Sequence, residues 1–107
     1  MIELPWPPKE LSPNARVHFM VKARATKAYK VDCWVVFCQH RAQLRGRTKF
    51  AVTFHPPSAR RFDRDGLISR LKPAQDALSA VVGIDDYHFE MTYRRGEPRK
   101  GGCVVVA

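Results

Sequence analysis

The feature that most constrains the fold of this chain is an uninterrupted segment, Lys22–Leu44, that contains neither glycine nor proline. Apolar residues recur in it at the three- and four-residue spacings of one helix face: Ala28, Val31, Val35, Cys38 and Ala42. The length of the segment favours a helix, although the run Cys33–Cys38 taken alone also fits a buried strand. Trp34, Val36 and Phe37 make the opposite face apolar as well. We therefore expect this helix to be covered on both sides, either by its own sheet and another element or by a second subunit.

The segments on either side predict a small mixed domain. A second helix is expected over Gly66–Val82, and Pro73 should kink it or split it in two, because proline has no amide hydrogen. Strands are expected at Ile2–Leu4, Thr48–His55, Tyr87–Arg94 and Cys103–Ala107. Residues 1–107 thus predict a single α/β (α+β) domain in the order β-α-β-α-β-β, homodimeric, with two helices and a mixed, mainly antiparallel sheet.

The charge of the chain points to a polyanionic partner. Nineteen Lys and Arg against ten Asp and Glu give a formal net charge of +9, which attracts nucleic acid. The longest apolar run, Cys33–Cys38, is far shorter than the ~20 residues that cross a bilayer. The first residues show no basic segment followed by an apolar run, so we expect a cytoplasmic protein with no membrane partner. The three cysteines lack zinc-type spacing, and we expect reduced thiols and no organic cofactor.

The acidic residues are segregated from the basic ones. Between Leu11 and Phe62 there are eleven Lys or Arg and one acid, Asp32; five acids then follow within 24 residues: Asp63, Asp65, Asp76, Asp85 and Asp86. If Arg60–Asp65 is extended, Asp63 and Asp65 point to the same side and their carboxylates share one space. A divalent cation between them is the economical explanation, and oxygen ligands suit Mg²⁺ or Mn²⁺. One acid of the pair Asp85 and Asp86 is expected to join them.

Three carboxylates in a strongly basic protein are typical of metal-dependent phosphodiester hydrolysis. Arg60, Arg61 and Arg64 lie beside the acids and can hold phosphates, and Lys72 can place an ammonium group near developing negative charge. Structural roles compete with this interpretation. Asp65 also fits the N-cap of a helix, and the pair Asp85 and Asp86 also fits an ordinary turn. Lys72 also fits a solvent-exposed position on a helix.

The string R-R-F-D-R-D-G-L-I-S-R-L-K-P-A-Q-D-A-L-S-A-V-V-G-I-D-D, residues 60–86, resembles the RusA-type Holliday junction resolvases. The opening L-P-W-P-P is similar to the start of that family. The resemblance implies a Mg²⁺-dependent endodeoxyribonuclease of phages and prophages that resolves four-way DNA junctions by paired nicking, as a homodimer, in recombination and repair. It implies Asp63, Asp65 and Asp86 as metal-binding carboxylates and Lys72 as the essential lysine.

Two departures from the family pattern bear on this assignment. Gly66 stands where an asparagine usually follows the D-x-D motif, and Lys72 comes seven residues after Asp65, against four in shorter family members. Arg70 is the alternative cation if the insertion turns Lys72 away. The expected DNA contacts are Arg60, Arg61, Arg64 and Arg70. The competing hypothesis is a non-catalytic, basic DNA-binding or architectural module whose acids are caps and turns.

Overall fold

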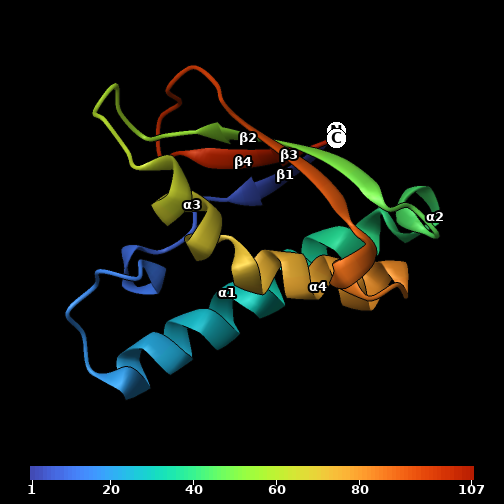
Figure 1. The fold of residues 1–107 in the computed structure, drawn as a ribbon, viewed down its shortest axis with the longest axis horizontal. Helices are drawn as coiled ribbons and strands as arrows, with labels where there is room; N and C mark the ends of the chain where they lie inside the picture. Colours follow the sequence, from blue (N-terminus) through green and yellow to red (C-terminus); the bar gives the residue numbers. More distant parts are fainter.

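The computed structural model of the chain describes residues 1–107 and contains one mixed sheet of four strands (Figure 1). The sheet order is β1-β4-β2-β3, with bounds Ile2–Pro5 for β1, Lys49–His55 for β2, Glu90–Arg95 for β3 and Cys103–Val106 for β4. Strand β4 pairs antiparallel with both β1 and β2, whereas β3 pairs parallel with β2. The small α+β domain and its mixed, mainly antiparallel sheet are confirmed.

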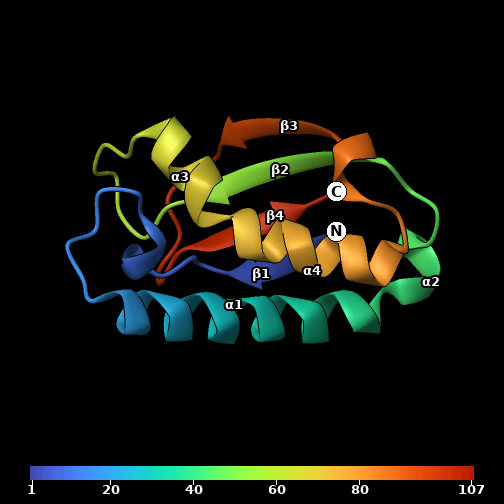
Figure 2. The same ribbon diagram turned by 60° about the horizontal axis from the view of Figure 1, so that its bottom comes forward.

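Four α-helices lie mainly on one face of this sheet (Figure 2). They are α1 (Phe19–Gln39), α2 (Arg41–Leu44), α3 (Arg64–Arg70) and α4 (Lys72–Val82), and two short 3-10 helices, η1 (Lys9–Leu11) and η2 (Asp86–His88), complete the fold. Helix α1 packs mostly against α4 and β1. The parallel neighbours β2 and β3 are connected through α3 and α4, so the chain passes over the helical face between them.

The core lies between the sheet and the helices. In β2 the buried residues alternate as expected, with Phe50, Val52 and Phe54 in the core and Lys49 and Ala51 exposed. The helices contribute Tyr29, Cys33 and Phe37 from α1, and Ala74, Ala77, Leu78, Val81 and Val82 from α4. Each large apolar side chain buried in this way stabilises the fold by about 1.5–3 kcal/mol.

The orientation of α1 reverses the simplest interpretation of its sequence. The regular stripe that includes Val31 and Val35 faces outward, where these residues are 50% and 47% exposed. The core instead takes the face with Tyr29, Cys33 and Phe37, which places two aromatic rings against the sheet layer. The expectation of a helix with apolar residues on both sides is confirmed, and its outer side is uncovered within one copy of the chain.

The expectation of two helices is wrong, because the structure has four α-helices. The first expected helix starts earlier, at Phe19, and is interrupted at His40 before α2. The second expected helix is split at Leu71. Pro73 lies in the first turn of α4, where backbone amides have no partner within the helix, so its missing amide hydrogen costs no hydrogen bond. The third expected strand starts only at Glu90, because Asp86–His88 forms the η2 turn. None of the helices is long and apolar enough to cross a membrane.

Candidate functional site

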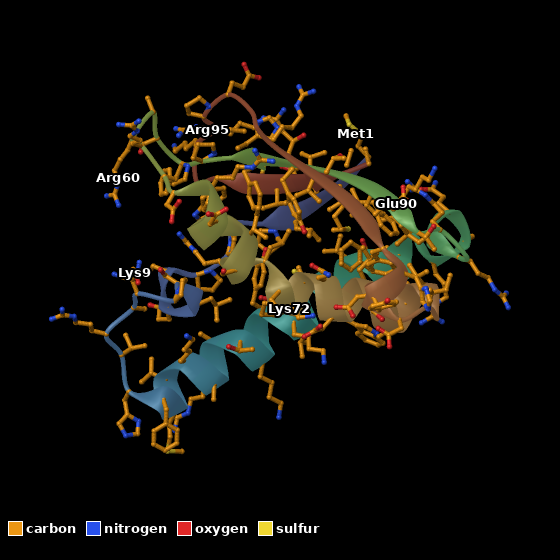
Figure 3. All side chains as sticks on the ribbon, in the orientation of Figure 1. Met1, Lys9, Arg60, Lys72, Glu90 and Arg95 are labelled. Carbon is orange, nitrogen blue, oxygen red and sulfur yellow. The ribbon has the colours of Figure 1, made fainter.

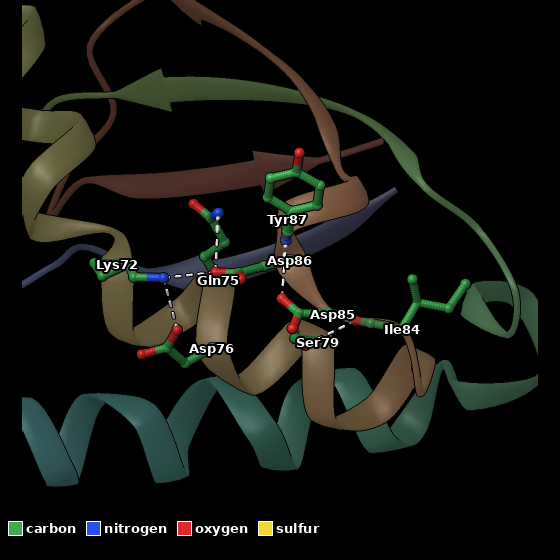
Figure 4. A network of polar contacts seen from close by, with 8 residues as sticks. All are labelled: Lys72, Gln75, Asp76, Ser79, Ile84, Asp85, Asp86 and Tyr87. Atoms are coloured by element: carbon green, nitrogen blue, oxygen red, sulfur yellow. Dashed lines mark hydrogen bonds and ion pairs between the residues drawn. The ribbon is translucent and has the colours of Figure 1, made fainter.

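The site centres on Lys72, the first residue of α4, whose ammonium group lies between two carboxylates (Figure 4). Its Nζ is 2.5 Å from Oδ2 of Asp86 and 2.9 Å from Oδ1 of Asp76. The side-chain amide of Gln75 donates a longer hydrogen bond, 3.4 Å, to the same Asp86 oxygen. The Lys72 side chain remains 56% exposed, so the ammonium group is accessible to a ligand from solution.

The local sequence explains why Asp86 returns to the start of α4. Gly83 ends α4 in the left-handed region at φ 80°, a conformation that glycine adopts without steric strain. Ser79 Oγ then donates to the carbonyl oxygen of Ile84 at 2.7 Å and holds the turn against the helix. Asp85 Oδ1 accepts from the amide of Tyr87 at 3.0 Å and caps η2. Asp85 is therefore a cap, and Asp86 is the acid of this pair that faces Lys72.

Opposite charges stabilise one another in the Lys72 cluster, where one ammonium group lies between two carboxylates. The hydrogen bond from Lys72 holds the pKa of the Asp86 carboxyl below its ordinary value. The hydrogen bond to Asp86, followed by that to Asp76, raises the pKa of Lys72 above its ordinary value. Both shifts favour the charged forms, so the pair stays ionised across neutral pH. Lys72 thus offers a permanent positive charge at the surface.

Asp63 and Asp65 lie at the start of α3, at the other end of that helix from Lys72. The expectation that they share an extended segment is wrong, because α3 begins at Arg64 and places Asp65 in its first turn. An acid is favoured there by the unpaired amides of the helix start. Asp63 is the N-cap residue, in place of the expected Asp65, and its side chain makes no capping hydrogen bond. The alternation that would aim both carboxylates at one point therefore does not apply.

The three acids implied as metal ligands do not converge. No group of three or more His, Cys, Asp or Glu side chains gathers closely enough to hold a metal ion. Asp86 is engaged by Lys72 at the start of α4, while Asp65 lies in the first turn of the separate helix α3. The carboxylate oxygens suit Mg²⁺ chemically, but in this arrangement the residues do not fit a three-carboxylate site.

Three of the expected DNA-contacting arginines are exposed. The Arg60 guanidinium lies 5.4 Å from the centre of the Phe62 ring, and Arg95 donates to the Arg60 carbonyl at 2.7 Å. Arg64 donates from Nη2 to the carbonyl of Tyr93 at 2.9 Å, which ties α3 to the edge strand β3. Figure 3 shows Arg60 and Arg95 at one end of the molecule and Lys72 near its middle. The basic side chains are thus distributed over a surface that is larger than the contact area of one phosphate group.

Arg70 differs from the other three arginines. Its Nη2 donates to the carbonyl of Pro7, and its guanidinium carbon lies 5.7 Å from the centre of a Trp6 ring. Its Nε is buried without a hydrogen-bond partner, and burial lowers the pKa of this guanidinium. Arg70 therefore packs against the N-terminal segment, and Lys72 is the cation that reaches Asp86.

Two hollows flank the loop Ser12–Asn14. One, of about 290 Å³, is lined by Lys72 and Asp76 together with Lys22 and Thr26 of α1. The other, of about 190 Å³, is lined by Asp63 and by three arginines, Arg60, Arg61 and Arg70. Both hollows carry cationic side chains beside a carboxylate, so the candidate site is a charged surface that extends from the start of α3 to the start of α4.

Sequence reasoning left three residues of this surface without a role in the site. Asp76 was detectable, because four residues separate it from Lys72 and such pairs face each other on a helix. Gln75, which also contacts Asp86, carries no charge and no distinctive spacing. Lys22 reaches the same hollow as Lys72 from a different helix, and nothing in its local sequence indicates this.

The fold and site define a small, basic α+β domain with a charged surface along α3 and α4. No protein-family model matches the chain. Over 113 aligned residues the chain is 34% identical to an uncharacterized protein of Xylella fastidiosa (strain Temecula1), and the alignment covers 98% of this chain and 72% of that protein. The chain belongs to the same family as this Xylella protein.

Proposed function

We propose that this protein is a structure-selective endodeoxyribonuclease that binds four-way DNA junctions as a homodimer and cleaves them by paired nicking. The observation that carries the proposal is the accessible Lys72 ammonium group, held by Asp76 and Asp86 in a chain with a net charge of +9. The order of acids and lysine from Asp63 to Asp86 resembles that of the RusA-type resolvases. Asp63, Asp65, Asp86 and Lys72 are the proposed catalytic residues, and recombination and repair are the proposed setting.

The roles of the cationic residues follow from their positions. Arg60, Arg61 and Arg64 are exposed and can hold backbone phosphates on either side of the cleaved bond. Lys72 stays protonated at neutral pH, so it can stabilise negative charge that develops on a phosphate in the transition state. Asp86 and Asp76 orient the ammonium group, and phosphate contact requires Lys72 to turn from one of them toward the ligand.

A requirement for Mg²⁺ or Mn²⁺ is part of the proposal. Because Asp63, Asp65 and Asp86 do not meet, a three-carboxylate metal site would require the segment at Asp86 and the start of α3 to approach each other. The measurable consequence is a strict dependence of cleavage on the divalent cation. Binding of the junction depends instead on the arginines and should persist without the cation.

The test uses purified protein with labelled four-way junction, duplex and single-stranded DNA, each with Mg²⁺, with Mn²⁺ and with chelator. The proposal expects paired nicks in the junction alone, only with a divalent cation. Tight junction binding with no cleavage under any of these conditions would contradict it. Equal cleavage of duplex and junction would contradict the proposed selectivity for structure.

A second candidate is a non-catalytic DNA-binding or architectural module. The observation that favours it is that Asp86 pairs with Lys72 and forms no group with Asp63 and Asp65 that could hold a metal ion. In such a module Asp86 would serve only to anchor the turn after α4 to its first residue. This candidate predicts salt-sensitive binding of the junction without nicking. Substitution of the acids by asparagine should then leave DNA binding unchanged.

A further inference from the structure

The outer side of α1 is an apolar surface that no part of the chain covers. With a helical rotation of about 100° per residue, Val31 lies opposite the buried side formed by Tyr29, Cys33 and Phe37. Figure 2 shows α1 as the outermost element, with the rest of the fold on one side of it. An uncovered apolar helix face of this length indicates a partner.

Apolar side chains are concentrated at both ends of this outer face. Met20 and Val21 are 50% and 46% exposed near the start of α1, and Trp34 and Val35 are 44% and 47% exposed near its end. Between them lies a shallow hollow of about 430 Å³, lined by Arg24, Lys27, Ala28, Val31 and Asp32. The small side chain of Ala28 leaves this hollow open.

Charges on the same face are arranged with opposite signs on either side of Ala28. Asp32 is the only acid between Leu11 and Phe62, and neither Asp32 nor Arg24 forms an ion pair within the chain. Ala28 is the midpoint between Arg24 and Asp32. It is also the midpoint between Val21 and Val35, so the charged pair and the apolar pair share one centre.

We infer that the partner is a second copy of this chain, and that two α1 helices pack antiparallel across a two-fold axis at Ala28. In this register each Arg24 faces Asp32 of the partner subunit, and each Val21 faces Val35 of the partner subunit. A small residue at the crossing allows close approach of the two helices. The interface is isologous, because each contact occurs twice.

The antiparallel direction follows from the charges and the shape. A parallel pair would place Arg24 beside Arg24 of the partner subunit and Asp32 beside its own copy, which is repulsive. Lys27 lies at the rim of the hollow, and its long side chain can extend to solvent. This inference specifies the homodimer of the proposed function, but it does not depend on nuclease activity.

The first test is a charge exchange, followed by analytical ultracentrifugation. The unmodified chain should be dimeric, and Arg24→Asp and Asp32→Arg should each weaken dimerisation by about tenfold or more, because like charges then face each other. The combination of both substitutions should restore it. Arg45→Asp makes the same change of charge as Arg24→Asp at an exposed residue outside α1 and should leave the dimer intact.

The second test places a cysteine on the proposed two-fold axis. In a Cys38→Ser background, Ala28→Cys should form an intersubunit disulfide on mild oxidation, because only a residue at the axis faces its own copy closely enough. Arg45→Cys in the same background should not. A monomeric unmodified chain, single variants that dimerise as well as the unmodified chain, or a double charge exchange that dimerises no better than the single variants would overturn the inference.

Two further outcomes separate this inference from its alternatives. A monomer whose junction binding is lost with Arg24→Asp would overturn it and make the outer face of α1 a DNA surface. A dimer that passes both tests but never cleaves DNA would support the interface and contradict only the proposed nuclease activity. Circular dichroism of each variant shows whether the fold is retained.

Discussion

Lys72 Nζ lies 2.5 Å from Oδ2 of Asp86, which follows it by fourteen residues in the chain. The contact joins the first turn of α4 to the turn that precedes β3. It therefore fixes the position of one cation and one acid at the α4 end of the candidate site. A structural role of this pair and a catalytic role predict different consequences when one charge is removed.

The first prediction concerns the acids. Asp63→Asn, Asp65→Asn and Asp86→Asn should each fold and bind junctions yet cleave at least about a hundredfold more slowly, because metal catalysis supplies several kcal/mol of transition-state stabilisation. Asp85→Asn is the matched neighbour control: asparagine can still cap η2, so cleavage should change little. Cleavage rates under single-turnover conditions provide the measurement. Normal cleavage by Asp65→Asn would contradict the assignment.

The second prediction concerns phosphate contacts. Because each lost contact reduces the dependence of binding on salt, Arg60→Ala with Arg61→Ala should lower the slope of log affinity against log salt by about two. The stability of the fold should not change, since both side chains are exposed. Fluorescence anisotropy of a labelled junction across a salt series measures the slope. An unchanged slope would mean that these arginines face away from DNA.

Arg70 provides the contrasting variant. Its guanidinium bonds Pro7 and lies against Trp6, so Arg70→Ala should destabilise the fold by about 1–3 kcal/mol through lost packing and an unpaired carbonyl. Chemical denaturation measures this loss. Unchanged stability together with a reduced salt slope would show that Arg70 acts as a DNA contact, as the sequence alone predicts.

The sequence predicted those parts of the fold that depend on local patterns. Alternation in β2 identified Phe50, Val52 and Phe54 as the core face, and Pro73 marked the division of the second helix. The boundaries of the helices were harder to predict from the sequence. Helix α3 starts at Arg64, two residues before the expected Gly66, which places Asp65 in a helical turn, so the alternation of an extended segment no longer relates Asp65 to Asp63.

Contacts between distant segments explain the remaining differences. Lys72 and Asp86 were both selected from the sequence, but their direct pairing depends on how Gly83 and Ser79 shape the turn. Lys22 joins the hollow beside Lys72 only because α1 and α4 pack together. No spacing rule links residues that are so far apart in the chain.

The third prediction is a loss of stability at alkaline pH. Burial raises the pKa of the Cys33 thiol from 9.0 to about 12, and burial also raises the pKa of Tyr29. Above pH 9.0 the unfolded chain releases the Cys33 proton while the folded chain keeps it, so stability falls as pH rises from 9.0 to about 12. This thiol should contribute up to about 1.4 kcal/mol per pH unit.

Denaturation midpoints measured from about two pH units below the onset at 9.0 to about two units above it test this prediction. Cys33→Ala removes the titrating group and should flatten the decline, although it also lowers stability at neutral pH by leaving a small void. Cys38→Ala is the matched control, because Cys38 is only partly buried. The same decline in Cys33→Ala as in the unmodified chain would contradict the assignment to this thiol.

The fourth prediction concerns Gly66, which stands where the RusA-type resolvases that the sequence resembles usually carry an asparagine. A Cβ atom at this position would lie 3.4 Å from Oδ2 of Asp63, which is ordinary contact, so a side chain can be accommodated. Gly66→Asn should be tolerated and gain a few tenths of a kcal/mol, because asparagine has a better helix propensity than glycine. Its amide would reach the Asp63 carboxylate and can orient it. We therefore expect metal-dependent cleavage of the junction to increase severalfold.

Gly66→Ala separates orientation of Asp63 from stabilisation of the helix. Alanine has the higher helix propensity and should stabilise α3 by about 1 kcal/mol, more than asparagine does, but it has no amide to bond Asp63. If orientation is the cause, Gly66→Asn cleaves faster than Gly66→Ala despite its lower stability. Equal cleavage by the two variants, measured with the same junction and cation, would show that the side-chain amide contributes nothing at this position.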